Sequence, residues 1–232
     1  MRLWLLVLSF VCFASNANTL NVMTEDFPDF QYTNHEGVLV GSAAEKIKAV
    51  LNKAEVDYTF SVNQWSVSYN AAQRNPNSCI FSIARSDSRE KLFDWLFPIS
   101  GFTTSFYGLR SKKYNIEKLD DALQYKTAVI RQNFSHLYLK ERGFEEDRHL
   151  IMISSFDNVF ELLATRKGFV DLVILSDVQF EHKRTTERKT SLLEKKYTLK
   201  NFGAQLYFAC NKALAPRTKE KIVEAYKALY QK

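Results

Sequence analysis

Short apolar runs alternate along the first half of the chain with segments whose apolar residues recur at helical spacing. The runs predict strands over 20–23, 58–62 and 79–84, and the spacing predicts helices over 42–53 and 65–74. The first of these helices also opens with the capping-box pattern of Ser42 and Glu45. Alternating strands and helices favour a parallel sheet covered by helices, with ligands beyond the carboxyl ends of the strands.

The second half repeats this scheme and predicts a second α/β lobe. Its strands are expected over 126–130, 149–153 and 172–175. Its helices are expected over 135–142 and around the apolar residues of 156–163, and a final amphipathic helix follows Pro216.

Two aromatic segments of similar texture, 105–110 and 205–210, lie where the chain passes between the lobes. Two crossing strands predict a hinge with a cleft between the lobes, and edge strands of a single sheet are the alternative. The expected organisation is a first lobe over 18–108, completed by 211–232, and a second lobe over 109–210.

The first 17 residues have the pattern of a secretory signal peptide. Arg2 precedes an apolar run over 3–13, and small or polar residues follow as far as Ala17. A membrane-spanning helix needs about 20 apolar residues, which is more than this run contains. The expected mature protein is therefore exported and lacks a membrane span.

Composition excludes several classes of site. The chain has 232 residues, 46% of them hydrophobic and 25% charged, which is typical of globular proteins. Its seven glycines stand singly, so no dinucleotide fingerprint or P-loop is present. The four histidines lack metal-ligand spacing, and no nucleophile-elbow motif occurs. We expect no metal, no cofactor and no catalytic residue.

The charge bears on nucleic-acid binding, and the cysteine content bears on a disulfide. The net charge is +6, and a basic stretch over 182–196 lacks interleaved aromatic residues, so it predicts a solvated face and no nucleic-acid site. Cys79 and Cys210 follow the signal segment, and an exported protein can hold a disulfide. The sequence leaves open whether these two thiols are bridged or free.

The segment 82–99 carries the most informative chemistry. Arg85 and Arg89 follow an apolar strand, at the edge of the sheet where a cleft is expected. An arginine there can hold a carboxylate through two parallel hydrogen bonds. The alternative is a surface pair neutralised by Asp87 and Glu90.

This segment resembles a signature of the family 3 extracellular solute-binding proteins, the amino-acid-binding-type receptors of ABC importers. The resemblance extends to the opening strand and loop over 22–32, to Trp65, to the turn over 126–133 and to the segment 168–172. It implies a type II periplasmic-binding-protein fold, with two α/β lobes joined by two crossing strands. It further implies a periplasmic monomer that captures a small polar, carboxylate-bearing solute, an amino acid or a related compound, for a transporter permease.

The resemblance also implies roles for residues of the first lobe. Arg89 matches the arginine that grips the ligand carboxylate, and Ser82 lies beside it at the strand end. Tyr32 and Trp65 match aromatic residues that enclose the ligand side chain. Arg85 adds positive charge to the expected cleft.

In the second lobe, the resemblance places Asn133 and Phe134 in a turn whose backbone N–H groups meet the carboxylate, and Arg131 adds positive charge. Where amino-acid binders have an Asp for the ligand ammonium, this chain has Ser176, followed by Asp177. Where the family has a turn glycine, this chain has Gln132. An α-amino acid is therefore not assured as the solute.

Two alternatives stay open beside this hypothesis. The first is a dehydratase-like enzyme of the same fold, for which Asp177 and Glu25 are the candidate acid–base residues. The second is a receptor that presents its bound ligand to a membrane sensor.

Overall fold

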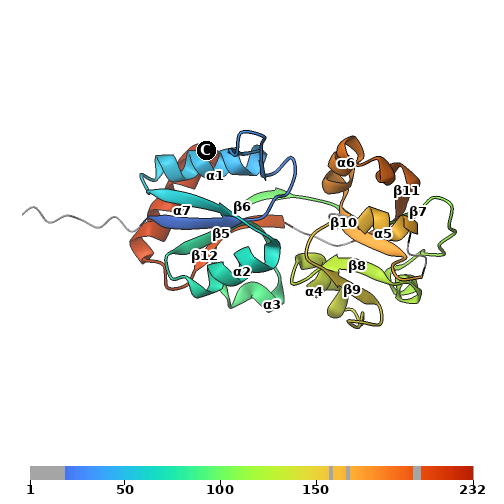
Figure 1. Cartoon of the computed structure of the whole chain (residues 1–232). Coiled ribbons are helices and arrows are strands. Elements are labelled where there is room, and N and C mark those ends of the chain that lie inside the picture. The colour runs from blue at the N-terminus through green and yellow to red at the C-terminus, as the bar shows by residue number, and fades with distance from the viewer. Residues whose placement is uncertain (1–18, 157–158, 166–167, 201–204, 232) are drawn as a thin grey trace, which may run out of the picture.

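The protein consists of two lobes, each built on its own five-stranded sheet (Figure 1). The computed structural model describes residues 19–156, 159–165, 168–200 and 205–231. The expected signal peptide over 1–17 lies outside these residues. Among the described helices, none has the length and apolar character needed to cross a membrane.

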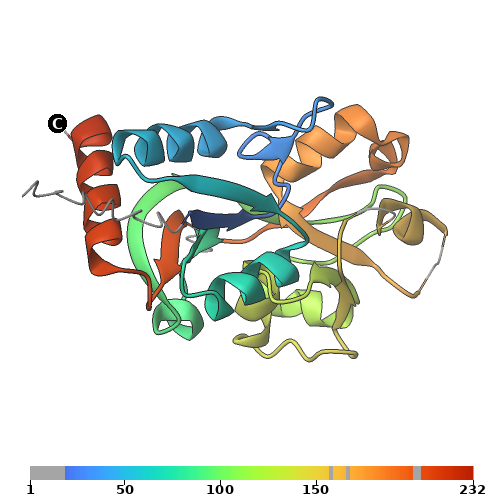
Figure 2. The ribbon, with the colours of Figure 1, turned by 60° about the vertical axis from the view of Figure 1, so that its left-hand side comes forward.

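The sheet of the first lobe has the strand order β4-β1-β5-β12-β6. β1, β4 and β5 are parallel, as the alternating pattern predicts, whereas β12 and β6 are antiparallel to their neighbours. The elements of this lobe are β1 (Leu20–Thr24), β2 (Tyr32–Thr33), β3 (Leu39–Val40), α1 (Ser42–Lys53), β4 (Tyr58–Val62), α2 (Trp65–Arg74), β5 (Ser78–Ala84), α3 (Asp87–Glu90), β6 (Phe93–Gly101), β12 (Gln205–Asn211) and α7 (Pro216–Tyr230). Figure 2 shows α7 beside α1, at the end of this lobe far from the second lobe.

The sheet of the second lobe has the order β11-β7-β10-β8-β9, with β8, β9 and β10 parallel. Its elements are β7 (Thr104–Leu109), the 3-10 helix η1 (Leu119–Gln124), β8 (Thr127–Ile130), α4 (Phe134–Lys140), β9 (Leu150–Ile153), α5 (Val159–Thr165), β10 (Leu172–Ser176), α6 (Asp177–Thr186), the 3-10 helix η2 (Arg188–Leu192) and β11 (Leu193–Thr198). The carboxyl ends of β8 and β10 therefore lead directly to the amino ends of α4 and α6 at the same edge of the sheet.

The observed strand pairing puts the two passages between the lobes at other residues than the sequence predicts. The sequence places these changes at residues 108 and 210. However, β7 already pairs with β10 and β11 of the second sheet, and β12 pairs with β5 and β6 of the first. The aromatic texture of these strands shows that they are buried, but it does not specify the sheet to which each strand belongs.

The start of α1 differs from its predicted capping box. Gly41 is the N-cap residue, with φ +115°, and no side chain caps the helix. The Ser42 hydroxyl instead donates to the Asp29 carbonyl oxygen at 3.0 Å, which ties the helix start to the loop after β1. The apolar face predicted for α1 is confirmed, because Ile47 and Leu51 are fully buried.

We expect Gly41→Ala to lower the free energy of unfolding by about 2–3 kcal/mol, because a Cβ there would lie 2.6 Å from the Phe30 carbonyl oxygen. Gly37→Ala is the matched control, since Gly37 also has a positive φ but no atom within 4 Å of the added Cβ. Urea denaturation measures both effects. Equal losses in the two variants would show that backbone conformation alone matters at Gly41.

Cys79 and Cys210 form a disulfide between neighbouring strands of the first sheet. They face one another in the antiparallel pairing of β5 with β12, and both are fully buried. They are 131 positions apart in the sequence, and the segment between them includes the whole second lobe. The lobe is thus inserted between two strands that are covalently joined, and the question that the sequence leaves open is resolved in favour of a bridge.

Candidate functional site

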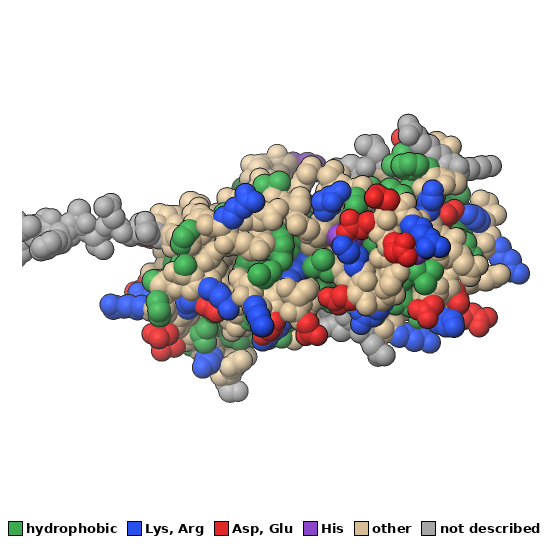
Figure 3. All heavy atoms as spheres, turned by 90° about the horizontal axis from the view of Figure 1, so that it is seen from below, with side chains coloured by type: hydrophobic (Ala, Val, Ile, Leu, Met, Phe, Trp, Pro, Cys, Tyr) green, Lys and Arg blue, Asp and Glu red, His purple; other side chains and the backbone are tan. Residues whose placement is uncertain are grey.

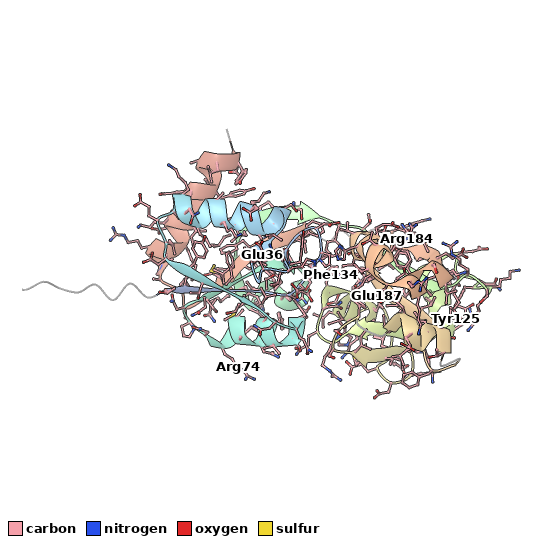
Figure 4. All side chains as sticks on the ribbon, turned by 45° about the horizontal axis from the view of Figure 1, so that its top comes forward. Glu36, Arg74, Tyr125, Phe134, Arg184 and Glu187 are labelled. Atoms are coloured by element: carbon pink, nitrogen blue, oxygen red, sulfur yellow. A yellow bond between two sulfur atoms is a disulfide. The ribbon has the colours of Figure 1, made fainter. Side chains whose placement is uncertain are left out.

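A cleft of about 400 Å³ lies between the two lobes. The loop after β1, from Glu25 to Thr33, and the start of α2 form its first-lobe wall. Ser154 to Phe156 and the face of α6 that carries Gln179 and His182 form its second-lobe wall. A smaller cavity of about 40 Å³ continues inward, and Phe134, which Figure 4 labels where the lobes meet, lines it.

Most of the residues singled out by the family resemblance come together here. Tyr32 lines the larger cleft, and Trp65 lines both the cleft and the inner cavity. The other residues that line the inner cavity and were expected at the site are Ser82, Arg89, Asn133, Phe134 and Ser176. Segments far apart in the sequence are thus assembled around one site, as the predicted topology requires.

Arg89 is fully buried at the seam between the lobes. Its Nη1 donates to the Ala84 carbonyl oxygen at 2.9 Å, and its Nη2 donates to the Gln132 carbonyl oxygen of the second lobe at 2.7 Å. The guanidinium lies 5.2 Å and 5.1 Å from the ring centroids of Trp65 and Tyr69. Burial lowers the pKa of Arg89 to about 10, and the nearby Tyr69 and Glu25 partly oppose this effect.

The end of β5 is held in an unusual backbone conformation. Ser82 has φ +57°, which is uncommon for a residue with a side chain. Its hydroxyl donates to Gln31 Oε1 at 2.6 Å, and both residues are buried. This bond fixes the strand end against the loop that carries Tyr32.

The second-lobe turn has a left-handed residue at the position where the resemblance implies a glycine. Gln132, which stands where the family has glycine, adopts φ +60°. Its backbone N–H donates to His136 Nδ1 at 3.0 Å. Asn133 is the N-cap of α4, and its Oδ1 accepts from the His136 backbone N–H at 2.8 Å. Contacts to the first turn of α4 therefore hold this turn in place.

Three of the expected residues line neither the cleft nor the inner cavity. Arg85 is exposed and pairs with Glu90, at 2.8 Å from Nε to Oε2. Arg131 is exposed and lines a separate depression, which shares Ile130 and Ser154 with the cleft. Asp177 is not among the residues that line either cavity.

The Asp177 carboxylate is instead bound within the second lobe. It accepts hydrogen bonds from the Tyr107 hydroxyl at 2.6 Å and from Lys195 Nζ at 2.7 Å. Burial tends to raise the pKa of Asp177, but bonds from these partners outweigh burial, and the net effect is a lowered pKa. Asp177 therefore fixes the start of α6 and does not line the cleft.

Glu25 is the residue at this site that the sequence undervalues. It follows β1 directly and lines both the cleft and the inner cavity. Its carboxylate has no hydrogen-bond or ion-pair partner among the described residues. Burial raises the pKa of Glu25 to about 8, against the opposing charge of Arg89. The position of Glu25 directly after a strand is a sequence signal for a place at the site. The sequence does not show that the Glu25 carboxylate lacks a partner.

Helix α6 contributes further residues that sequence reasoning missed. Gln179, His182, Lys183 and Thr186 recur at helical spacing and line the cleft. The pair His182–Lys183 belongs to the basic stretch that predicts a solvated face. His182 and Lys183 lie three and four positions after Gln179, on the same face of the helix. This spacing is the sequence signal that would have placed them in the cleft.

The rest of that basic stretch lies on a surface of mixed charge. Arg184 pairs with Glu181, Lys189 with Glu161, and Lys196 with Glu194. Figure 3 shows positive and negative side chains interspersed over the visible face of the second lobe. No group of three or more potential metal ligands occurs among the described residues.

Comparisons with solved structures support the fold. A histidine kinase sensor domain with similarity to periplasmic binding proteins has a TM-score of 0.79 at 20% identity, covering 91% of this chain and 90% of that chain. An ancestral arginine-binding protein bound to arginine gives 0.75 at 21%, with 91% and 92% covered. The arginine-, lysine-, histidine-binding protein of Geobacillus stearothermophilus gives 0.74 at 21%, with 91% and 89% covered.

A comparison with curated proteins found no match. The model of the bacterial extracellular solute-binding proteins, family 3, matches residues 20–232, which is nearly all of the described chain. The fold is accordingly the mixed α/β, two-lobed fold of periplasmic binding proteins. The chain belongs to family 3 of the bacterial extracellular solute-binding proteins.

Proposed function

We propose that this chain is an exported receptor that captures a small polar solute of the amino-acid class between its lobes. The observation that carries the proposal is the cleft, whose walls come from both lobes and whose first-lobe wall holds the unpartnered Glu25 carboxylate. A solute that contacts both walls stabilises the closed arrangement more than the open one. Solute binding therefore favours closure.

The surroundings of Glu25 favour a solute with a cationic end. A half-buried carboxylate gains most from a positively charged partner, which replaces the water that it has lost. Tyr32 and Trp65 line the same space, and aromatic rings also attract cations. The arginine-binding proteins that share the fold are consistent with this solute class.

We expect Glu25→Gln to weaken the binding of a basic amino acid at least tenfold, because the amide keeps the shape of the side chain and removes its charge. Asp29→Asn is the control, since Asp29 is exposed on the same loop and does not line the cleft. Isothermal titration with arginine, lysine and histidine measures the affinities. Unchanged affinity in Glu25→Gln would remove Glu25 from the site.

The partner of the loaded protein is a separate question. A transporter permease follows from the family, whereas the fold shared with a histidine kinase sensor domain favours a membrane sensor. Cells that lack this chain should lose uptake of labelled solute in the first case. In the second case they should keep uptake and lose a transcriptional response.

Binding without turnover is part of the proposal. Of the two acid–base candidates, Asp177 is bound to Tyr107 and Lys195 and lies outside the cleft, so only Glu25 is near a bound solute. Recovery of the solute unchanged after prolonged incubation is the expected result. Appearance of a product would favour the enzyme alternative.

A further inference from the structure

The Gln132 carbonyl oxygen receives two hydrogen bonds from the opposite lobe. Arg89 Nη2 donates to it at 2.7 Å and Trp65 Nε1 donates at 2.8 Å. The side chain of the same residue accepts from Asn70 Nδ2 at 3.4 Å. One turn of the second lobe is thus held by three side chains of the first lobe.

The turn presents this oxygen because its backbone is in the left-handed region. A residue with a side chain pays a conformational cost at φ +60°, and its surroundings must hold it there. The bond from the Gln132 N–H to His136 supplies one restraint, and the Asn133 cap of α4 supplies another. These restraints hold the Gln132 carbonyl oxygen toward the first lobe.

Arg89 is shielded from a solute in this arrangement. Each of its terminal nitrogens donates one hydrogen bond to a backbone carbonyl, and the guanidinium is fully buried beside two aromatic rings. Only Nε lacks a partner, and it is also buried. Because the guanidinium is fully buried, capture of a carboxylate by Arg89 requires movement of the groups that cover it, and the Gln132 turn is one of them.

The distribution of space agrees with this reading. The cavity beside Arg89 measures about 40 Å³. The cleft beside Glu25, Tyr32 and His182 measures about 400 Å³. The cleft is large enough for an amino-acid-sized solute, whereas the space next to Arg89 is much smaller.

We propose that the Gln132 carbonyl oxygen, bonded to Arg89 and Trp65, is a latch that holds the two lobes together. This oxygen takes the place beside Arg89 that a solute carboxylate would occupy, so the solute does not need a carboxylate in order to bind. Arg89 is then a positioning residue that acts on closure. The inference rests on the proposed function and narrows it, because amines and guanidines without a carboxylate become solutes of the same cleft. Agmatine and cadaverine, the decarboxylated counterparts of arginine and lysine, are suitable probes.

The first test compares arginine with agmatine on the wild-type chain and on Arg89→Gln by isothermal titration. A latch weakens both solutes by the same factor when it is lost, so the ratio of the two affinities should agree within about threefold between the two proteins. A direct grip on the carboxylate predicts loss of arginine binding alone. A ratio that changes tenfold or more would overturn the proposal.

The second test needs no solute. Small-angle X-ray scattering of the solute-free chain should give a radius of gyration that increases by about 1 Å in Trp65→Phe and Arg89→Gln, because the lobes open. Trp65→Phe removes the indole donor and keeps an aromatic ring, so it covers the case in which Arg89→Gln fails to fold. Arg74→Gln is the control, since Arg74 is exposed at the far end of α2 (Figure 4).

The two tests separate the latch from the solute class. If neither arginine nor agmatine binds, the cationic solute class fails, and the scattering measurement still judges the latch. An unchanged radius of gyration in Trp65→Phe and in a folded Arg89→Gln would overturn the latch. Opening of both variants, with Arg74→Gln unchanged, would support it.

Discussion

Loss of the Cys79–Cys210 disulfide is expected to lower the free energy of unfolding by about 3–5 kcal/mol, because the bridge closes a long loop. The 131-residue separation restricts the unfolded chain strongly, and the buried strands β5 and β12 also lose their covalent link. The double variant Cys79→Ala/Cys210→Ala in urea denaturation measures the effect. The wild-type chain unfolded in the presence of dithiothreitol should show a similar loss.

The control for this prediction is the double variant itself treated with dithiothreitol. It contains neither of the bridged thiols, so reductant should leave its midpoint unchanged. A wild-type midpoint that does not respond to reductant during unfolding and refolding would contradict the bridge. The effect bears on function because β5 leads directly to Ser82 and Arg89, and β12 pairs with it.

The free energy of unfolding of the solute-free protein is expected to fall by about 2–4 kcal/mol between pH 5 and pH 8.5 as a result of the ionisation of Glu25. Burial raises the pKa of Glu25 from its ordinary value of 4.5 to about 8, so the folded state binds more protons than the unfolded state in this window. Its contribution is fully present below pH 4.5 and is lost as pH rises through 8. Each unit of pKa difference corresponds to ~1.4 kcal/mol, and partial hydration of the side chain reduces the total.

Glu25→Gln should remove this pH dependence, which urea denaturation at several pH values measures. Asp29→Asn should keep it, since that side chain is exposed outside the cleft. A wild-type profile identical to that of Glu25→Gln would show that Glu25 ionises as readily as it does in water. A bound cation should also offset the loss at high pH, because it stabilises the charged carboxylate.

The elements with clear periodicity are the ones that the sequence predicts well. Helices α1 and α2 and the strand β4 have the bounds expected from their apolar pattern. The sequence does not reveal that β6, β7, β11 and β12 are antiparallel, because an aromatic strand has the same pattern whichever neighbour it pairs with. The boundaries between the lobes shift for the same reason.

The sequence predicts where the candidate site lies better than it predicts the hydrogen-bond partners of the residues there. Residues at strand ends, such as Ser82 and Ser176, reach the expected edge because the parallel topology brings those ends together. Arg85 and Arg89 are four residues apart, yet Arg85, before the extended N-cap Ser86 of α3, is exposed, whereas Arg89, within α3, is buried. The partners of Arg89 include a backbone carbonyl in the other lobe, and sequence carries no signal for that contact.

The central claim is that one solute is held between the lobes, with a cationic group at Glu25. A crystal structure of the chain with its tightest-binding basic amino acid or amine tests this most directly. The account predicts a nitrogen of the solute within hydrogen-bonding distance of the Glu25 carboxylate and further contacts to Gln179 or His182 of the second lobe. A solute bound to one lobe alone, or held away from Glu25, would contradict it.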